Sequence, residues 1–449
     1  MGKETVLKTL RHEKTDEVAW VPFTGVHAAF MKGYTATEIL TDGDKLFDAL
    51  MNVHKLYTPD GMPIVFDLQI EAEILGCKLF WADENPPSVV KHPLRKTKEV
   101  PCKCKIPKAT DGRIPMVIET AKRVKDAIGD DTALYGLICG PVTLASHLRG
   151  TDFFMDIISD PEYVKELVGF CAEVNMAMAQ YYIDAGMDVI AVVDPLISQV
   201  SPKAIEAHFL EPFQAIFDYI RNQDTLSCMF VCGDATNQMD VMARCHADGI
   251  SIDENVDIKK AKEITDKYNV TICGNIPLTT VMLFGNQLDN MKYVVDMMDN
   301  IDHHNLVISP GCDMPFKIPV DNTIACVQAI KHTDESREMV KNHESAGALM
   351  DIELPDYDNL TKPFVELFTL DAETCAACTY MVNAVMEVHA DMSDLFDVAE
   401  YKYCIKEDIA RTQKMGVEHL PSIYINGKCR WSSIIPAREE LIAAIKELV

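Results

Sequence analysis

Cysteine and acidic residues stand next to each other at two places where an apolar run ends. In "SCMFVCGDAT" (227–236) the run stops at Cys232-Gly233-Asp234, and in "LVISPGCDMP" (306–315) it stops at Gly311-Cys312-Asp313. Thiolates and carboxylates both bind transition metals, and sulfur ligands favour zinc. Cysteine is also a common small core residue, so packing is the alternative explanation.

A second pair of cysteines lies near the C-terminus, in "DAETCAACTYMVNAVMEVHA" (371–390), a stretch with a helical pattern. Cys375 and Cys378 fall in the first turn of the predicted helix, where unpaired backbone N–H groups and the helix dipole stabilise a thiolate. We expect Cys375 to be the attacking thiol and Cys378, one turn further in, the resolving thiol. Half of a zinc site is the alternative, but no second cysteine pair at a suitable spacing follows in this part of the chain, which favours redox chemistry.

The elements that position the first two cysteines form a repeating pattern. From residue 20 to about 332, short apolar runs alternate with longer amphipathic stretches, which is typical of repeated βα units. The predicted strands are 19–26, 62–68, 133–138, 187–194, 227–232, 249–253, 270–275 and 306–310. Eight strands separated by helices predict an α/β fold, a (β/α)8 TIM barrel. No Gly-x-Gly-x-x-Gly follows the first strand, which argues against a dinucleotide-binding fold.

Nearly every predicted strand leads into a side chain that could do chemistry. Catalytic residues of such barrels lie where the strands end, at the C-terminal face. In strand order the candidates are His27; Asp67, Gln69, Glu71 and Glu73; Cys139; Asp194; Cys232 and Asp234; Asp253 and Glu254; Asn275; and Cys312. The sequence therefore predicts one mouth rich in thiols and carboxylates. Five cysteines, one of them the strand-end Cys139, lie in apolar or helical contexts and are expected to be packing residues: Cys139, Cys171, Cys245, Cys273 and Cys326. "PCKCKIP" (101–107) either binds metal or forms a loop.

The chain changes character after the barrel. Residues 333–361 are polar and acidic, without a strong period, and are predicted to be a linker between a barrel at 1–332 and a small domain at 362–449. The small domain shows the order β-α-β-α-β-β-α, with an Asn426-Gly427 hairpin turn. This order, the paired cysteines and Pro421 before the third strand resemble the thioredoxin-like proteins. The resemblance implies that Pro421 is cis and packs against the cysteine pair.

The composition of the chain excludes some classes of partner and indicates the compartment in which the protein works. A formal net charge of −27 argues against nucleic acid or an anionic membrane surface as a partner. No apolar run approaches the roughly 18 residues of a membrane span, and the N-terminus has no continuous apolar segment of a secretory signal. Fifteen cysteines without an export signal are expected to be reduced thiols. A cytoplasmic protein of anaerobic metabolism is the expectation.

Longer motifs carry a resemblance to a known family. "FDLQIEAEILGCKLFW" (66–81), "CGPVTLASHLRG" (139–150) and "SPGCDMPFKIPVDNTIACVQAI" (309–330) resemble the uroporphyrinogen decarboxylase superfamily, and within it the cobalamin-dependent methyltransferases. Decarboxylase members carry an N-terminal arginine-rich motif for porphyrin carboxylates. This chain has no arginine between Arg11 and Arg95, which argues against porphyrinogen decarboxylation.

The resemblance implies a zinc site. The methyltransferases of this branch bind zinc through His-x-Cys after strand five and a cysteine after strand eight, and Cys232 and Cys312 match these cysteines. Phe230 stands where the histidine would be. Another side chain must then complete the site; Glu71 is the predicted metal ligand, with Asp194, Asp253 and His27 as alternatives. Asp194, Asp253 and Asn275 are predicted to contact the corrinoid.

The leading hypothesis is a zinc-dependent enzyme that moves a methyl group from a methyl-corrinoid, carried by a partner protein, to a small thiol such as coenzyme M. Zinc would keep the acceptor sulfur deprotonated and nucleophilic. The tail would supply thiol-disulfide redox chemistry, with a thiol-redox partner. The alternative is a thiol-disulfide oxidoreductase or corrinoid-binding protein whose barrel has lost methyl transfer.

Overall fold

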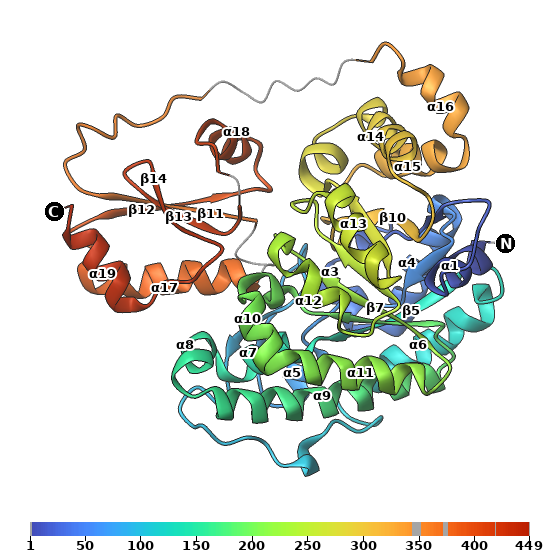
Figure 1. Cartoon of the computed structure of the whole chain (residues 1–449), viewed down its shortest axis with the longest axis horizontal. Coiled ribbons are helices and arrows are strands. Elements are labelled where there is room, and N and C mark those ends of the chain that lie inside the picture. The colour runs from blue at the N-terminus through green and yellow to red at the C-terminus, as the bar shows by residue number, and fades with distance from the viewer. Residues whose placement is uncertain (1, 344–351, 371–375, 418, 449) are drawn as a thin grey trace. The chain divides into compact units, whose positions relative to one another are not determined.

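The computed structural model describes residues 2–343, 352–370, 376–417 and 419–448 (Figure 1). The chain divides into two compact units, Met1–Ser345 and Ala346–Val449. Within the described residues, no helix is both long and apolar enough to cross a membrane.

The first unit is built on eight parallel strands, each of which overlaps one of the eight predicted strands. They are β1 (Ala19–Trp20), β2 (Gly61–Pro63), β5 (Ala133–Cys139), β6 (Val189–Val193), β7 (Leu226–Val231), β8 (Gly249–Ile252), β9 (Thr271–Ile276) and β10 (Leu306–Pro310). They pair in the order β1-β10-β9-β8-β7-β6-β5-β2, which makes a nearly closed barrel. The predicted α/β barrel is thereby confirmed. A short antiparallel hairpin, β3 (Lys78–Phe80) with β4 (Ser88–Lys91), was not predicted.

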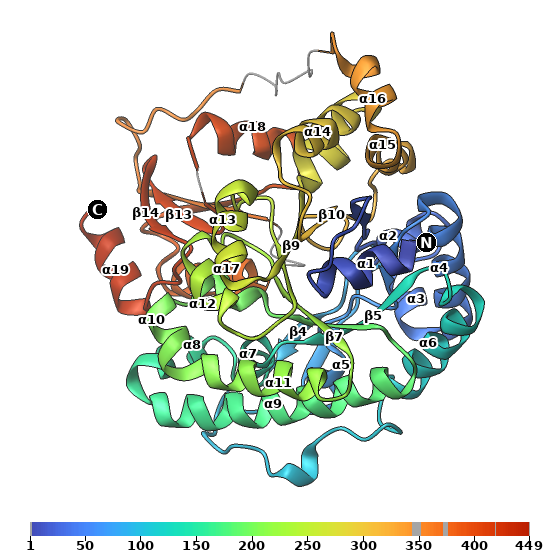
Figure 2. The same ribbon diagram turned by 45° about the vertical axis from the view of Figure 1, so that its right-hand side comes forward.

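Helices surround this barrel (Figure 2). The longer ones are α4 (Gly43–Tyr57), α6 (Ile114–Ile128), α7 (Pro141–Arg149), α8 (Asp152–Ser159), α9 (Pro161–Asp184), α11 (Leu210–Arg221), α13 (Ile258–Tyr268), α14 (Gln287–Asn300), α15 (Val320–Lys331) and α16 (Thr333–Val340). Shorter helical turns are α2 (His27–Phe30), α3 (Ala36–Thr41), α5 (Ile70–Ile74), α10 (Pro202–Ala204) and α12 (Met239–Ala243). Helix α16 falls within the stretch predicted as a linker and packs with α14 and α15.

The barrel interior is a filled core. Inward side chains from the strands and from the segments that directly follow them, among them Phe23, Tyr135 and Phe230, form one buried cluster. Helix α1 (Gly2–Leu10) adds Val6 and Leu10 to the same cluster and thereby closes the N-terminal end of the barrel. The C-terminal end is where the interior meets solvent, because half-buried Cys232 and Cys312 are packed against this cluster.

The barrel closes between β1 and β2 through one aspartate. The backbone N–H of Asp60 donates to the carbonyl of Trp20 at 3.0 Å, and the Trp20 N–H donates to the Asp60 carboxylate at 2.8 Å. The Asp60 carboxylate also pairs with Lys331 of α15, at 2.7 Å. A buried carboxylate with these partners takes the place of strand pairing at this seam.

The second unit is a separate four-stranded sheet with three helices. Its elements are β11 (Phe364–Thr369), α17 (Ala376–Met392), β12 (Asp397–Lys402), α18 (Lys406–Lys414), β13 (Ser422–Ile425), β14 (Lys428–Ser432) and α19 (Arg438–Lys446). The strands pair in the order β12-β11-β13-β14; β12 is parallel to β11, whereas β13 is antiparallel to both β11 and β14. The predicted order of elements is confirmed, and the Leu420–Pro421 bond is cis. The likeness to thioredoxin stays a prediction.

Candidate functional site

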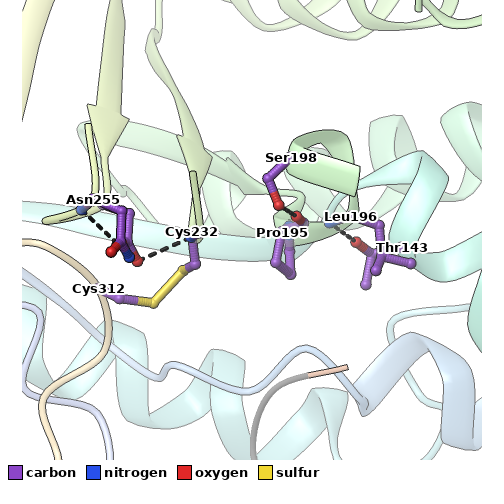
Figure 3. Close-up of a disulfide and its surroundings, with 9 residues drawn as sticks. Thr143, Pro195, Leu196, Ser198, Cys232, Asn255 and Cys312 are labelled. Atoms are coloured by element: carbon purple, nitrogen blue, oxygen red, sulfur yellow. Dashed lines mark hydrogen bonds between the residues drawn. A yellow bond between two sulfur atoms is a disulfide. The ribbon is translucent and has the colours of Figure 1, made fainter. Parts of the chain in front are cut away.

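Two of the predicted site cysteines meet at the C-terminal end of the barrel. Cys232 directly follows β7, and Cys312 comes two residues after β10. Their Cα atoms are 5.9 Å apart and their sulfur atoms are joined in a disulfide (Figure 3). Residues separated by 80 positions in the sequence thus form one site at the barrel mouth.

Phe230 is a core residue. Its ring lies 4.7 Å from the ring of Phe23 and 5.5 Å from that of Phe66, in edge-to-face contacts, and its side chain is fully buried. Edge-to-face aromatic pairs add to the stability gained by burial. The position of the expected metal histidine is therefore part of the hydrophobic core.

Asp253 and Glu254, directly after β8, hold the two turns that carry the cysteines. The N–H of Gly233 donates to Asp253 Oδ2 at 2.9 Å. Gly311 packs so closely against this segment that a Cβ there would lie 2.7 Å from the backbone nitrogen of Glu254. Gly233 has φ +83°, a left-handed conformation that glycine adopts readily. One segment therefore fixes the backbone on both sides of the disulfide.

Asn275, on β9, ties this segment to the barrel. Its Nδ2 donates to the carbonyls of Asp253 at 2.9 Å and Val256 at 2.7 Å, and its Oδ1 is buried without a hydrogen-bond partner. Asp253 and Asn275, predicted as corrinoid contacts, thus both contribute to positioning the cysteines. Their contact with a corrinoid stays a prediction.

Asp194, directly after β6, binds the start of α7. Its carboxylate accepts hydrogen bonds from the N–H groups of Val142 and Thr143 and from the Thr143 hydroxyl, at 2.6 to 3.1 Å. Gly140 permits this approach, because a Cβ there would lie 2.4 Å from the Asp194 Cβ. Burial raises the pKa of Asp194 to about 7, although these hydrogen bonds favour the ionised form. Capping the helix, an ordinary structural role, accounts for all of these contacts.

Glu71, on α5, is buried, and only one of its two carboxylate oxygens accepts a hydrogen bond. Its Oε1 accepts the N–H of Cys139 at 3.1 Å, and its Oε2 has no hydrogen-bond partner. Burial raises the pKa of Glu71 to about 7, so this side chain can hold or release a proton near neutrality.

Two further carboxylates at the strand ends have raised pKa values. Asp313 follows Cys312, and its Oδ1 is buried without a hydrogen-bond partner. Gly25 leaves room for it, since a Cβ there would overlap Asp313 Oδ1. Burial, with a smaller contribution from Asp67, holds the pKa of Asp313 well above its usual range. Burial and the neighbouring Asp253 raise the pKa of Glu254 to about 8. Asp313 was absent from the predicted site, although its place beside Cys312 was a signal for it.

His27, an alternative metal ligand from the sequence, is fully engaged elsewhere. Its Nε2 lies 2.7 Å from the hydroxyl of Tyr57, and its Nδ1 lies 2.9 Å from the carbonyl of Phe316. Burial lowers the pKa of His27 to about 4, so it is a neutral core histidine. The cysteines predicted to be packing residues are buried, which confirms that prediction for Cys139, Cys171, Cys245, Cys273 and Cys326.

The residues at the mouth do not fit zinc. A zinc site needs at least three protein ligands. Across the part of the chain that the structure describes, no group of three or more histidine, cysteine, aspartate or glutamate side chains could hold a metal ion. The two thiols are bonded to each other, and Glu71 does not join them in such a group. Cys102 and Cys104 likewise form a disulfide, at a short 3-10 turn (Lys103–Lys105).

The second unit contributes one described cysteine of its predicted pair. Cys378, in the first turn of α17, is buried, and its sulfur accepts the backbone N–H of Leu370 at 3.3 Å. Cys375 lies outside the described residues. Pro421 directly precedes β13.

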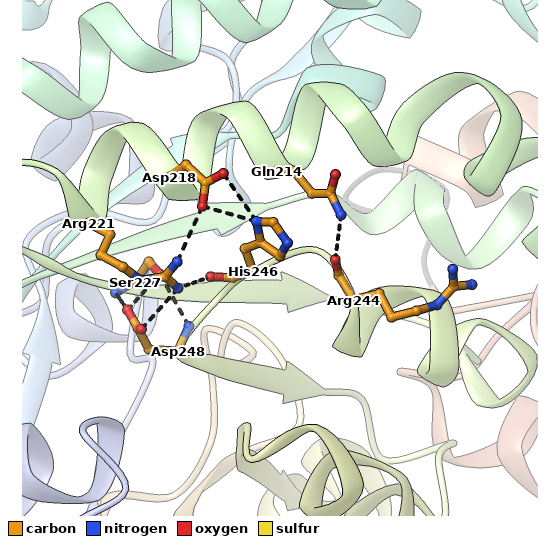
Figure 4. A network of polar contacts seen from close by, with 7 residues as sticks. All are labelled: Gln214, Asp218, Arg221, Ser227, Arg244, His246 and Asp248. Carbon is orange, nitrogen blue, oxygen red and sulfur yellow. Dashed lines mark hydrogen bonds and ion pairs between the residues drawn. The ribbon is translucent and has the colours of Figure 1, made fainter.

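A cavity of about 470 Å³ lies at the opposite end of the barrel, between α11, α13 and the residues that precede β8. Its lining includes Arg221, Arg244 and His246 (Figure 4). Asp218 accepts from Arg221 and His246, and Asp248 pairs with Arg221 at 3.4 Å. Paired charges at the N-terminal ends of the strands are typical of a stabilising network.

Known proteins similar to this chain cover the barrel. Methylcobamide:CoM methyltransferase MtbA of Methanosarcina acetivorans is 27% identical over 339 residues, which are 74% of this chain and 97% of that protein. Methylcobamide:CoM methyltransferase MtaA of Methanosarcina barkeri is 28% identical over 313 residues, 68% of this chain and 87% of that protein. A solved methyltransferase structure from Methanosarcina mazei has the same fold, with a TM-score of 0.67, 24% identity, and coverage of 74% of this chain and 98% of its own. Residues 1–333 match the uroporphyrinogen decarboxylase (URO-D) family, and the chain belongs to this family.

Proposed function

We propose that the barrel transfers a methyl group from a methyl-corrinoid to a small thiol such as coenzyme M. The observation that carries the proposal is the similarity to two methylcobamide:CoM methyltransferases over 97% and 87% of their lengths. The strand-end site fits such a reaction, because it combines two half-buried cysteines with two carboxyl groups, Glu71 and Glu254, whose pKa values are raised to about 7 and about 8.

The reaction needs a deprotonated acceptor. The sulfur attacks the methyl carbon, a C–S bond forms, and the Co–C bond breaks with both electrons left on cobalt; the thiol proton goes to a base. Zinc, when bound, supplies a stabilised thiolate. The described residues include no group of three metal ligands, and we propose that a side chain of this chain receives the proton.

Glu71 has two properties of such a base. Its Oε2 has no hydrogen-bond partner, and burial raises its pKa to about 7. A base works best when its pKa lies near the working pH. Glu71, predicted from the sequence as a metal ligand, is thus proposed as a proton acceptor.

We propose that the corrinoid is presented by a separate protein, since the sequence has no Asp-x-His-x-x-Gly cobalamin-binding signature. The second unit is proposed to be a thiol-disulfide domain with its own redox partner. Its element order, the position of Cys378 at the start of α17 and Pro421 before β13 support this assignment.

The test is thiol methylation by the full chain, purified without oxygen and reduced beforehand. Methylcobalamin and coenzyme M are the substrates, and the methyl thioether is measured by mass spectrometry. We expect methylation above the uncatalysed rate, and a loss of about 100-fold or more in Glu71→Gln. Glu73→Gln, a change on the same helix at a side chain paired with Arg113, is the matched control. A wild-type rate equal to the uncatalysed rate refutes the proposal.

A further inference from the structure

The mouth of the barrel has two cysteines where a metal centre was expected, and the residues there do not fit a metal. We propose that Cys232 and Cys312 are a reversible dithiol–disulfide pair, a redox site that exchanges electrons with protein dithiols and small thiols. The link to methyl transfer made below rests on the proposed function. The existence of the pair does not.

Exposure separates these two cysteines from the free cysteines described in the first unit. Cys232 and Cys312 are half-buried, so both residues are partly open to solvent at the mouth of the barrel. Each free cysteine described in the first unit is buried: Cys77, Cys139, Cys171, Cys228, Cys245, Cys273 and Cys326. Thiol–disulfide exchange requires access of the attacking sulfur, which the pair at the mouth provides.

The disulfide does not hold the strands together. β7 pairs with β8, β8 with β9, and β9 with β10, so the ends that carry the two cysteines are already joined by backbone hydrogen bonds. Because backbone hydrogen bonds already join these strands, a crosslink between their ends adds little further stability. A structural role is therefore the weaker explanation.

The backbone also places the sulfur atoms together without the bond. Gly233 is held by Asp253 Oδ2 at 2.9 Å, and the N–H of Gly311 donates to the carbonyl of Ile276 at 3.1 Å. Both turns lie on the segment Asp253–Glu254. The Cα separation of 5.9 Å falls within the range of disulfides, so the pair can open and close with little backbone movement.

The exchange between the Cys232–Cys312 disulfide and an external thiol balances in electrons and protons, and no further oxidant or reductant is needed. A reduced dithiol attacks the disulfide, gives two electrons and two protons to Cys232 and Cys312, and becomes a disulfide itself. Two molecules of a small acceptor thiol can do the same in two steps: the first forms a mixed disulfide with one cysteine and frees the other as a thiol, and the second frees the first cysteine and leaves as the small disulfide. While the pair is oxidised, the acceptor is consumed in this exchange at the place where it should be methylated. Methyl transfer therefore needs the dithiol form.

The experiment follows both cysteines directly in the full chain carrying Cys102→Ser and Cys104→Ser, which removes the other described disulfide. The native protein is equilibrated without oxygen in mixtures of reduced and oxidised dithiothreitol. Free thiols are then trapped with N-ethylmaleimide under denaturing conditions and located by peptide mass spectrometry. We expect both cysteines to change together, from alkylated to linked, and to return on reduction.

Single substitutions give the comparison. In Cys232→Ser we expect Cys312 to be alkylated at every dithiothreitol ratio, and in Cys312→Ser we expect the same of Cys232. Cys326→Ser, at a buried position of α15, should leave the redox titration of the pair unchanged. Three results overturn the inference: Cys312 labelled alike with and without Cys232; a bond that opens only after unfolding; or stoichiometric zinc that both substitutions remove. None of these readouts requires activity, so failure of methyl transfer is distinguished from failure of the pair. In the active enzyme, we expect the oxidised form to show a lag that prior reduction abolishes.

Discussion

Replacing Glu71 by glutamine should change how stability depends on pH. Burial raises the pKa of Glu71 from its ordinary 4.5 to about 7 in the folded chain. Each difference of one between the folded and unfolded pKa corresponds to about 1.36 kcal/mol, so ionised Glu71 destabilises the fold by ~3 kcal/mol. The amide of Glu71→Gln does not titrate and is free of this effect.

The sign follows from proton binding. Below pH 4.5 the side chain is protonated in both states and contributes no pH dependence. Between pH 4.5 and about 7 the folded chain keeps a proton that the unfolded chain has released, so the free energy of unfolding falls as the pH rises. Above that window the loss is complete. Relative to Glu71→Gln, the wild type should lose ~2.5 kcal/mol of stability between about pH 5 and pH 8.

Urea unfolding at the two pH values, in reductant and without oxygen, measures this difference. Trp431→Phe as a shared background leaves Trp20 and Trp81 as the fluorescent reporters, both in the first unit. Glu73→Gln controls for the loss of a carboxylate from α5. If wild type and Glu71→Gln change in parallel, with a difference constant to within ~0.5 kcal/mol, Glu71 does not carry its proton in the folded state and the reasoning fails.

Three further predictions concern other parts of the chain. Phe230→His should lower the free energy of unfolding by ~3 kcal/mol, because it removes an aromatic ring from the core and buries a polar one. The variant should also bind no zinc, and one zinc per chain by metal analysis would contradict this second expectation. Asp253→Ala removes the acceptor for the Gly233 N–H and should favour the dithiol form of Cys232 and Cys312, shifting the dithiothreitol ratio at which the pair is half-oxidised by ~10-fold. Thiol trapping measures this ratio, and an unchanged ratio counts against the role of this carboxylate. Cys378→Ser should abolish turnover of a small disulfide by the second unit, whereas Cys429→Ser, at an exposed cysteine of β14, should not; equal rates for the two variants would rule out the assigned dithiol.

The barrel could be predicted because each strand is a short apolar run between turn residues. The first two strands are shorter than predicted, since only two and three residues pair with a neighbour before the backbone leaves the sheet. The β3–β4 hairpin escaped prediction because its residues are largely exposed and carry no clear alternation of apolar and polar side chains.

The site could be predicted in part. Strand-end position was enough to bring Cys232 and Cys312 together, because parallel strands of a barrel end at one face. The orientation of α5 was beyond the sequence, and it directs Glu71 to the backbone of Cys139. The buried Oδ1 of Asp313 lies against Gly25, nearly 290 residues earlier in the chain, a proximity that only the folded barrel creates.

The seam at Asp60 has a consequence for how the barrel moves. Seven of the eight strand junctions are backbone ladders, whereas β1 and β2 meet through one residue and its ion pair with Lys331. The two hydrogen bonds between Asp60 and Trp20 and the ion pair with Lys331 can break without disturbing any ladder, so the cylinder should open there first, as a local fluctuation well below the free energy of global unfolding. Amide hydrogens around Trp20 should then exchange with solvent earlier than those of β7 to β9. The lysine of this ion pair belongs to α15, so the junction between the first two strands depends on a helix some 270 residues further along the chain.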